Sequence, residues 1–288
     1  MPSKVILLTG GNSGIGKAAA IELARSGAEL TLVCRDRERA EKARGDILRS
    51  SGARSLDLIL ADLTLLSEAQ RVAKEFTSTH ARLDVLVNNA GSNFPEYAET
   101  SEGLERTMAL NYYAPWALTQ GLLPLLRSSA PSRVVNVASV AHFSGRLDLN
   151  NPNGKGDMGV GGLGAYSRSK LALVLYTYEL ARRLKGSGVT VNCLHPGAVR
   201  THIWAHAGRY RILVQFASLF MLSPKAGART LVFLATSPEV EGVSGTYFEK
   251  CREKTSSARS RDPKLAVDLW ELTERVVKAG RFPPPAAP

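Results

Sequence analysis

The 288-residue chain is poor in cysteine and contains no long hydrophobic run. Cys34, Cys193 and Cys251 are odd in number and far apart, with no Cys-x-x-Cys pair among them. This pattern excludes a disulfide framework and a structural zinc site, and it predicts free thiols in a reducing compartment. No run of 18 apolar residues occurs, so we expect no membrane-spanning helix. Because Met1–Lys4 is too short and polar for a signal peptide, we expect a cytoplasmic protein.

The sequence also lacks aromatic residues interleaved with its basic ones. Its formal net charge is +11 and its pI is near 9.8, but lysine and arginine are scattered along the chain. Only modest basic clusters occur, at Arg35–Arg44 and Lys250–Lys264. Such clusters are poorly suited to stacking on bases, so we expect no nucleic-acid partner. A phosphate-bearing cofactor or acidic lipid head groups would use the positive charge better.

What the chain does contain is a regular alternation of β-type and α-type segments. The apolar patterns predict strands at Lys4–Thr9, Ala28–Val33, Ser55–Leu60, Leu83–Val87, Arg133–Ser139, Val189–Leu194 and Gly245–Phe248. They predict helices at Lys17–Arg25, Arg37–Ser50, Ser67–Thr79, Leu104–Leu126, Ala165–Leu184, Pro224–Ala235 and Pro263–Lys278. We therefore expect one doubly wound α/β domain over residues 1–281, with a central parallel sheet of about seven strands flanked by helices. The proline-rich tail 282–288 is expected to be disordered.

A glycine-rich turn joins the first predicted strand to the first predicted helix. Its sequence is Gly10-Gly-Asn-Ser-Gly-Ile-Gly16, with the spacing Gly-x-x-x-Gly-x-Gly. A strand, a glycine turn and a helix together offer backbone N–H groups and the positive end of a helix dipole to a diphosphate. Glycine also lets the phosphates approach without a Cβ in the way. The turn predicts a dinucleotide site made by Gly10, Asn12, Ser13, Gly14, Ile15 and Gly16.

The end of the second strand bears on the choice of dinucleotide. An acidic residue there would bind the ribose 2′-hydroxyl of NAD, whereas Arg35 could hold the 2′-phosphate of NADP. Lys17, just after the glycine turn, could add a second positive charge. Alternatively, both cations are solvated residues at helix starts, with Asp36 as an N-cap. We favour NADP(H) and keep NAD(H) as the alternative.

Other small and polar residues follow the third, fourth and sixth strands. Asp62 and Leu63 stand where a carboxylate could meet the adenine amino group. Asn88-Asn89-Ala90-Gly91 can line a cofactor groove or tie neighbouring strands together. His195-Pro196-Gly197 closes the sixth strand, and we interpret His195 as structural because a histidine that ends a buried strand is seldom a base.

The strongest chemical signal is Tyr166-x-x-x-Lys170 near the start of an apolar helix. Residues four apart share a helix face, so the phenol and the ammonium project the same way. A neighbouring cation favours the phenolate, which would turn a tyrosine of ordinary pKa near 10 into a usable acid/base. Ser139, at the end of the fifth strand, could hydrogen-bond a substrate oxygen. In isolation, the motif could also be a surface tyrosine and lysine that happen to be four apart.

Three further features remain open from the sequence. Asn111 is a mediocre mid-helix residue, so it is either solvent-facing or part of a kink whose freed carbonyl holds a water. Residues 144–164 are rich in glycine and asparagine and predict a mobile loop beside the site. The segment at about 198–223 mixes aromatic, aliphatic and basic residues, which favours a lid over an apolar substrate or a shallow membrane-contact helix.

Together these motifs resemble those of the short-chain dehydrogenase/reductase family, in the family's order, over about residues 4–250. The resemblance implies a Rossmann fold in which Tyr166 is the general acid/base and Lys170 lowers its pKa and holds the nicotinamide ribose. It implies that Ser139 orients the substrate oxygen and that Asn111 completes a proton relay through water. It also implies cofactor contacts from Asn89, Ala90, Gly91, Tyr166, Lys170, Pro196, Gly197, Val199 and Thr201.

Within that family the chain is most similar to the retinol dehydrogenase branch. The shared segments are Val33–Asp36, Ala130–Arg133, Ser139–His142, Glu179–Gly188 and Ser244–Phe248. The branch implies an NADP(H)-dependent oxidoreductase that interconverts a small lipophilic alcohol and its carbonyl. Lipophilic contacts are expected from Phe143, Trp204, Phe216 and Leu219, and the alternative is that these are core residues. The loop Asn150–Gly164 is richer in glycine than this resemblance leads one to expect.

The family resemblance also allows a homodimer or homotetramer through the helices at 104–126 and 165–184, and a peripheral membrane contact. One alternative function is an NAD-preferring dehydrogenase of steroids or small alcohols. Another is a catalytically silent, nucleotide-sensing protein on the same scaffold. The usual sign of a silent protein would be loss of Tyr166 or Lys170, and both are present.

Overall fold

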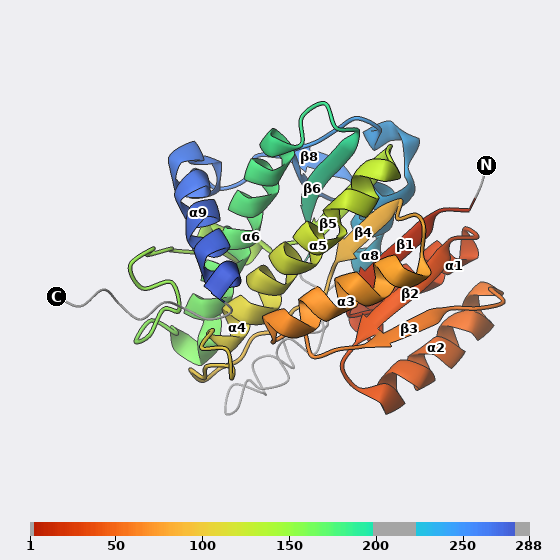
Figure 1. Ribbon diagram of the computed structural model, residues 1–288, viewed down its shortest axis with the longest axis horizontal. Coiled ribbons are helices and arrows are strands. Elements are labelled where there is room, and N and C mark those ends of the chain that lie inside the picture. The colour runs from red at the N-terminus through yellow and green to blue at the C-terminus, as the bar shows by residue number, and fades with distance from the viewer. Residues whose placement is uncertain (1–2, 198–222, 280–288) are drawn as a thin grey trace.

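Hydrophobic strands form the centre of the computed structural model, which describes residues 3–197 and 223–279 (Figure 1). In these residues one eight-stranded sheet has the order β3-β2-β1-β4-β5-β6-β7-β8. Its parallel strands are β1 (Val5–Thr9), β2 (Glu29–Cys34), β3 (Asp57–Leu60), β4 (Val85–Asn88), β5 (Ser132–Val137), β6 (Val189–His195) and β7 (Tyr247–Glu249). The expected doubly wound α/β fold is confirmed. The strand order reverses between β1 and β4, which opens a crevice at their carboxyl ends.

The sheet has one strand more than the seven expected. β8 (Arg252–Lys254) pairs antiparallel with β7 across a turn in which Lys250 and Cys251 have positive φ angles of 50° and 59°. Two successive left-handed residues make a hairpin turn whose twist matches that of the strands. The sequence did not indicate β8 because its three residues are charged and exposed, so no apolar alternation marks them.

Helices cover both faces of the sheet because alternate strand residues point to opposite sides. Ile6 and Leu8 pack with α1 (Gly14–Arg25), α2 (Arg37–Ser51) and α8 (Pro224–Thr236). Leu7 faces the other side, where α3 (Leu66–Thr79), α5 (Ala114–Ser128) and α6 (Leu163–Arg183) lie. Continuous apolar strands are required where both faces are buried in this way.

The helix expected at 104–126 is not one regular helix. A short turn, α4 (Arg106–Met108), leads into a π-helical segment at Ala109–Tyr113, and only then does α5 begin. Asn111 is completely buried in the π-helical segment, so the solvent-facing alternative is wrong and the helix is irregular at this position. A water held by a freed backbone carbonyl stays a prediction. Such π-bulges inside α-helices often mark functional sites.

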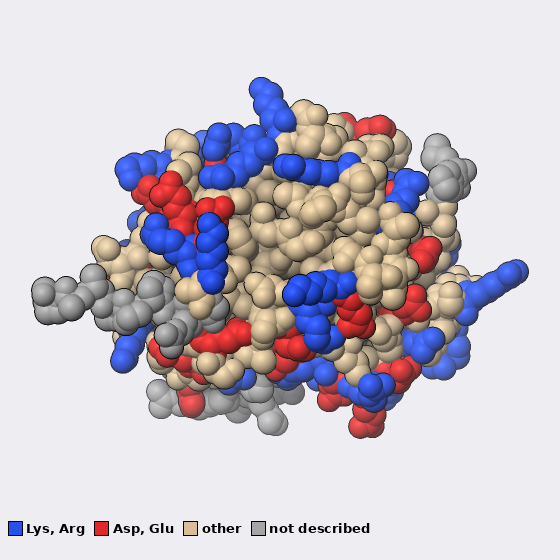
Figure 2. Space-filling model, in the orientation of Figure 1, with Lys and Arg blue, Asp and Glu red and all other residues tan. Residues whose placement is uncertain are grey.

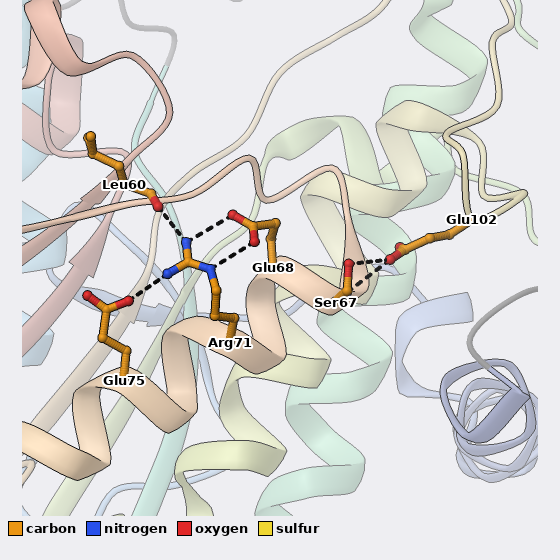
Figure 3. A network of polar contacts seen from close by, with 6 residues as sticks. All are labelled: Leu60, Ser67, Glu68, Arg71, Glu75 and Glu102. Carbon is orange, nitrogen blue, oxygen red and sulfur yellow. Dashed lines mark hydrogen bonds and ion pairs between the residues drawn. The ribbon is translucent and has the colours of Figure 1, made fainter.

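The first turn of α3 is capped from a distant part of the chain (Figure 3). The Glu102 carboxylate accepts hydrogen bonds from the backbone N–H groups of Leu66 and Ser67 and from the Ser67 hydroxyl. On the same helix, Arg71 donates to Glu68, to Glu75 and to the carbonyl of Leu60 at the end of β3. These contacts fix the end of β3, two residues before Asp62.

A C-terminal helix, α9 (Pro263–Ala279), packs against α6. The buried Trp270 ring stacks on Tyr176 of α6 at 5.8 Å and meets Trp116 of α5 edge-on at 5.8 Å. The Arg183 guanidinium lies 4.2 Å from the same ring. α9 therefore covers part of α6, one of the two helices expected to serve in oligomerisation. Figure 2 shows few charged side chains at the centre of this face, over α5, so pairing through α5 and α6 would use mainly α5. Oligomerisation stays a prediction.

Replacing Trp270 by Ala is expected to lower the free energy of unfolding by about 3–5 kcal/mol, because truncating a buried aromatic leaves a cavity. Urea denaturation measures this difference. Lys264→Ala is the matched control, since that side chain on the same helix is 83% exposed and should leave the unfolding midpoint close to that of the unchanged chain. A Trp270→Ala loss below about 1 kcal/mol would contradict the packing of α9 on α5 and α6.

Five further predictions from the sequence concern the extent of the domain, the lid, the tail, membrane spanning and the cysteines. We propose that residues 1–281 form one domain, because segments 3–197 and 223–279 share one sheet. The expected lid at about 198–223 falls almost wholly outside the described residues, and so does the tail 282–288. In the described part of the chain, no helix is both long and apolar enough to span a bilayer. All three cysteines are free, as expected.

Candidate active site

A groove of about 820 Å³ opens at the carboxyl ends of the strands, where the strand order reverses. The predicted cofactor residues that lie in the described chain all line it: Gly10, Asn12, Ser13, Gly14, Ile15, Gly16, Arg35, Asp62, Leu63, Asn89, Ala90, Gly91, Tyr166, Lys170, Pro196 and Gly197. Ser139 also lines it. Val199 and Thr201 lie outside the described residues. The fold therefore brings together residues from seven separate segments of the chain, each of which the sequence had predicted on its own.

Close packing explains the glycines of the turn between β1 and α1. A Cβ on Gly16 would lie 2.1 Å from the Gly10 carbonyl oxygen and 2.5 Å from Asn89 Nδ2. Gly10 and Gly14 have positive φ angles of 71° and 52°, in the left-handed region that favours glycine. The turn is thus folded back on itself and tied to the end of β4.

The start of α1 fits an anionic group. Ser13 is the N-cap residue but makes no side-chain capping hydrogen bond, and the first turn contains no acidic residue. Backbone N–H groups at such a helix start need a partner, and the helix dipole favours a negative one. A dinucleotide diphosphate supplies that charge, so the residues present suit the cofactor that the sequence predicted.

Charged side chains gather where β2 and β3 end. Arg35 is 63% exposed, and its Nη1 lies 3.9 Å from Asp62 Oδ2. Asp36 caps α2 by accepting a hydrogen bond from the Arg39 N–H at 2.8 Å, as the alternative reading of this segment expected. Arg35 nevertheless borders the groove, so the N-cap role of Asp36 does not remove it from the site.

Lys17 does not add the second positive charge that the sequence suggested for the cofactor groove. Lys17 Nζ forms an ion pair with Asp46 of α2 at 2.5 Å, and it does not line the groove. Arg39 does line it, although the sequence interpretation passed over this residue. Its position in the first turn of α2, soon after Arg35 in the sequence, was the available signal.

The two asparagines that end β4 have different roles. Asn89 Nδ2 donates to the carbonyls of Thr9 and Gly10, and its backbone N–H donates to Thr9 Oγ1. Asn88 points into the interior, where its Nδ2 donates to Asn136 Oδ1 at 2.9 Å and to Thr119 Oγ1. Asn89 therefore ties β4 to β1 and borders the groove, whereas Asn88 links β4 to β5 and α5.

Tyr166 and Lys170 lie on one face of α6, as their spacing predicted. Lys170 Nζ is 5.7 Å from the centre of the Tyr166 ring and donates to the Val137 carbonyl at 2.8 Å. Burial raises the pKa of Tyr166, and a hydrogen bond with Ser139 opposes that rise. Burial also lowers the pKa of Lys170 to about 8. The Tyr166 pKa is therefore raised and not lowered as expected, because burial of the phenol has the largest effect on it.

Asn111 stands behind the groove rather than in its wall. Its Oδ1 accepts from the Ser92 N–H, while its Nδ2 donates to the Ser92 carbonyl and to Ser169 Oγ, each at 2.9 Å. A Cβ on Gly91 would lie 3.0 Å from Asn111 Oδ1 and 3.4 Å from Lys170 Nζ. The π-helical segment thus brings Asn111 close to Lys170, on the far side of Gly91.

Two histidines hold the turn that follows Ser139. His195 Nδ1 accepts from the Val140 N–H at 3.2 Å, which supports the structural interpretation of this residue. His142 was missed: its buried ring donates from Nδ1 to the Ser139 carbonyl at 2.7 Å and accepts at Nε2 from the Ser257 N–H. Since Nε2 accepts from a backbone donor, the neutral Nδ1–H form is the one that fits. His142 lies three residues after Ser139, but no sequence signal showed that its ring turns back.

Apolar side chains stand at the mouth of the groove. Val140 is 54% exposed and Leu163 is 39% exposed, and both line the groove together with Phe94. Phe143 is 51% exposed and does not line it. Trp204, Phe216 and Leu219 lie outside the described residues.

Comparison with known proteins agrees with this geometry. A family model described as short chain dehydrogenase matches residues 4–211. Retinol dehydrogenase 14 of Homo sapiens is 41% identical over 294 aligned positions, which span 96% of this chain and 87% of that protein. Retinol dehydrogenase 11 of Homo sapiens is 39% identical over 273 positions, covering 95% of this chain and 85% of that protein.

Solved structures give the same result. An uncharacterized protein from Mycobacterium Paratuberculosis has a TM-score of 0.76 and 31% identity, over 99% of this chain and 97% of its own. RhlG of Pseudomonas aeruginosa, solved as an active-site complex with NADP, has a TM-score of 0.68 and 29% identity. That match covers 85% of this chain and 93% of RhlG.

Proposed function

We propose that this chain, which belongs to the short-chain dehydrogenase family and to its retinol dehydrogenase branch, uses NADP(H) to interconvert a lipophilic alcohol and its carbonyl. An oxidoreductase acting on CH–OH groups is what the family and its retinol dehydrogenases indicate. The observation that carries the finer proposal is the meeting of Tyr166, Lys170 and Ser139 in one groove with the glycine turn. The NADP complex of RhlG and the exposed apolar residues at the mouth of the groove support the choice of cofactor and substrate class.

The residues divide the work as follows. Gly10–Gly16 would hold the diphosphate, Arg35 the 2′-phosphate, and Lys170 the nicotinamide ribose. When bound, NADPH supplies the hydride that reduces the carbonyl carbon. Tyr166 would donate a proton to the carbonyl oxygen, and Ser139 would orient that oxygen by a hydrogen bond. Because burial raises the pKa of Tyr166, the phenol stays protonated at neutral pH, which is the form needed for reduction.

Two paired measurements test this proposal. NADPH and NADH are titrated separately against the chain while energy transfer from protein to nicotinamide is followed, and we expect NADPH to bind more tightly. NADPH-dependent reduction of retinal is then compared with that of small water-soluble aldehydes, and we expect retinal to be preferred. Tighter NADH binding would favour the steroid or small-alcohol alternative. Binding of neither dinucleotide would overturn the oxidoreductase proposal for this groove.

Replacing Arg35 by Ser is expected to weaken NADPH binding by about 10–100-fold and to change NADH binding less than about two-fold. The reason is that a hydrogen bond to a charged group contributes about 1.5–3 kcal/mol, and only NADPH carries the 2′-phosphate. The same titration measures the change. Lys17→Ser is the matched control, because Lys17 pairs with Asp46 and should not affect selectivity. Equal losses for both dinucleotides in Arg35→Ser would show that Arg35 does not face the 2′ position.

A further inference from the structure

We infer that Arg168 is a positioning residue that locks the glycine loop (residues 150–162) onto α6, so that this loop caps the helix turn that carries Tyr166. The inference rests on the proposed function, because only a catalytic Tyr166 gives the lock a consequence for turnover. It also explains why position 154 of this loop is a glycine.

Arg168 lies between Tyr166 and Lys170 in sequence but points away from them. Two residues along an α-helix correspond to a rotation of roughly 200°, so Arg168 lies on nearly the opposite side of α6 from Tyr166. It does not line the groove, and it is only 2% exposed. A buried guanidinium needs partners for its N–H groups, since an unpaired buried charge is costly.

The glycine loop supplies partners for both Nη atoms. Arg168 Nη1 donates to the Asp157 carbonyl at 3.1 Å and lies 3.4 Å from the Asp157 carboxylate. Nη2 donates to the Asn153 carbonyl at 3.4 Å. Burial lowers the pKa of Arg168, and the nearby carboxylates of Glu105 and Asp157 oppose that change. The side chain therefore joins two points of the loop to the second turn of α6.

Contact with Arg168 requires glycine at position 154. Gly154 has a φ angle of 63°, and a Cβ there would lie 2.0 Å from the Arg168 guanidinium carbon. Gly156 is also left-handed, with a φ angle of 83°, but a Cβ on it would meet nothing within 4 Å. The two glycines differ in their contact with Arg168, which makes them a matched pair for experiment.

The locked loop in turn supplies the cap of α6. The helix begins after Gly162 without any side-chain cap. Instead the carbonyl of Met158, the residue after Asp157, accepts from the N–H groups of Gly164 at 2.7 Å and Ala165 at 3.2 Å. Arg168 thus reaches back over the loop to hold the residue next to the one that caps the first turn. Tyr166 follows directly after Ala165, so the position of its phenol depends on this closed ring of contacts.

The loop is also anchored to the segment that leads to Asn111. Asn153 Oδ1 accepts from the Glu105 N–H and its Nδ2 donates to the Gly103 carbonyl, each at 2.9 Å. The fully buried Glu105 carboxylate accepts from the N–H groups of Thr107 and Met108, which start α4. Arg168 therefore connects the starts of the two helical segments that carry the candidate catalytic residues.

Hydrogen exchange of the α6 segment 163–167 tests the lock without any substrate. We compare Arg168→Met and Gly154→Ala with the control Gly156→Ala, which places the same methyl group in the same loop. Exchange of the Gly164 and Ala165 amides should accelerate at least ten-fold in the first two variants and less than about three-fold in the control. Unchanged exchange in both test variants, or equal acceleration in all three, would overturn the inference.

Catalysis provides the second readout, with retinal and NADPH as probes. We expect kcat to fall about ten-fold or more in Arg168→Met and Gly154→Ala, because small misplacements of a reacting group are costly, while NADPH affinity changes less than about two-fold. Arg168→Lys, which keeps a charge that can reach one carbonyl, should restore part of kcat.

The double variant should lose no more than either single variant, because both remove the same contact. Additive losses, or a matching loss of NADPH affinity, would count against positioning. If the unchanged chain binds NADPH but does not reduce retinal, the proposed substrate fails while the exchange result still decides the role of Arg168.

Discussion

Replacing Tyr166 by Phe is expected to lower kcat for carbonyl reduction by roughly 10³-fold while NADPH affinity changes less than about two-fold. Positioned proton donors contribute about 10²–10⁴-fold, and the substitution removes only the phenolic oxygen. The substitution also removes the hydrogen bond between Tyr166 and Ser139. Ser139 should nevertheless keep its place, because His142 and His195 hold the turn that follows it. Steady-state rates and the NADPH titration measure the two quantities separately.

The control for this prediction is Tyr176→Phe. Tyr176 is a second buried tyrosine on α6, but it faces Trp270 and does not line the groove. The kcat of the Tyr176→Phe variant should therefore stay within about three-fold of that of the unchanged chain, since the substitution only removes a hydroxyl from the core. If Tyr166→Phe kept more than a tenth of the original kcat, the proton would have to come from another group.

Replacing Gly16 by Ala should reduce NADPH affinity by at least about 100-fold. The added Cβ would lie 2.1 Å from the Gly10 carbonyl oxygen, and a backbone atom cannot move aside as a side-chain end can. The turn must therefore open, which separates α1 from β1 and misplaces the N–H groups that would face the diphosphate. Overpacking of this kind also costs about 1–3 kcal/mol of stability, so folding is checked by circular dichroism.

Gly27→Ala is the matched control for Gly16→Ala. Gly27 has a left-handed φ angle of 83° and nothing within 4 Å of an added Cβ, so its substitution strains the backbone without closing a gap. Position 16 differs from position 27, because it has no room for a Cβ but does not need a positive φ angle. Equal NADPH affinity in the two variants would show that the close approach at Gly16 does not shape the cofactor site.

Local patterns in the sequence were sufficient for the architecture and for most of the groove. Strand and helix periodicities predicted seven of the strands, because burial on both faces demands continuous apolar runs. The glycine turn, Arg35, Asp62 and the Tyr166/Lys170 pair all follow from residues adjacent or four apart in the chain. Such features are local, and local geometry is what a sequence pattern reports.

Tertiary structure decided the features that depend on which distant residues meet. Asp46 of α2 draws Lys17 away from the groove and leaves Arg39 beside it, although both cations follow predicted site residues closely in sequence. Asn111 became a buried residue of a π-helical segment because Ser92 and Ser169 satisfy its amide. Desolvation reversed the expected direction of the Tyr166 pKa shift, and burial is a property of the whole fold.

The glycine loop shows the same division most clearly. Its composition was visible in the sequence and suggested only mobility beside the site. The glycine at position 154 is explained by the Arg168 guanidinium, which lies against it and takes its hydrogen-bond acceptors from Asn153 and Asp157. The residue types needed for chemistry were therefore determined by the sequence alone. Their placement depends on contacts between segments far apart in the chain, and only the folded structure brings those segments together.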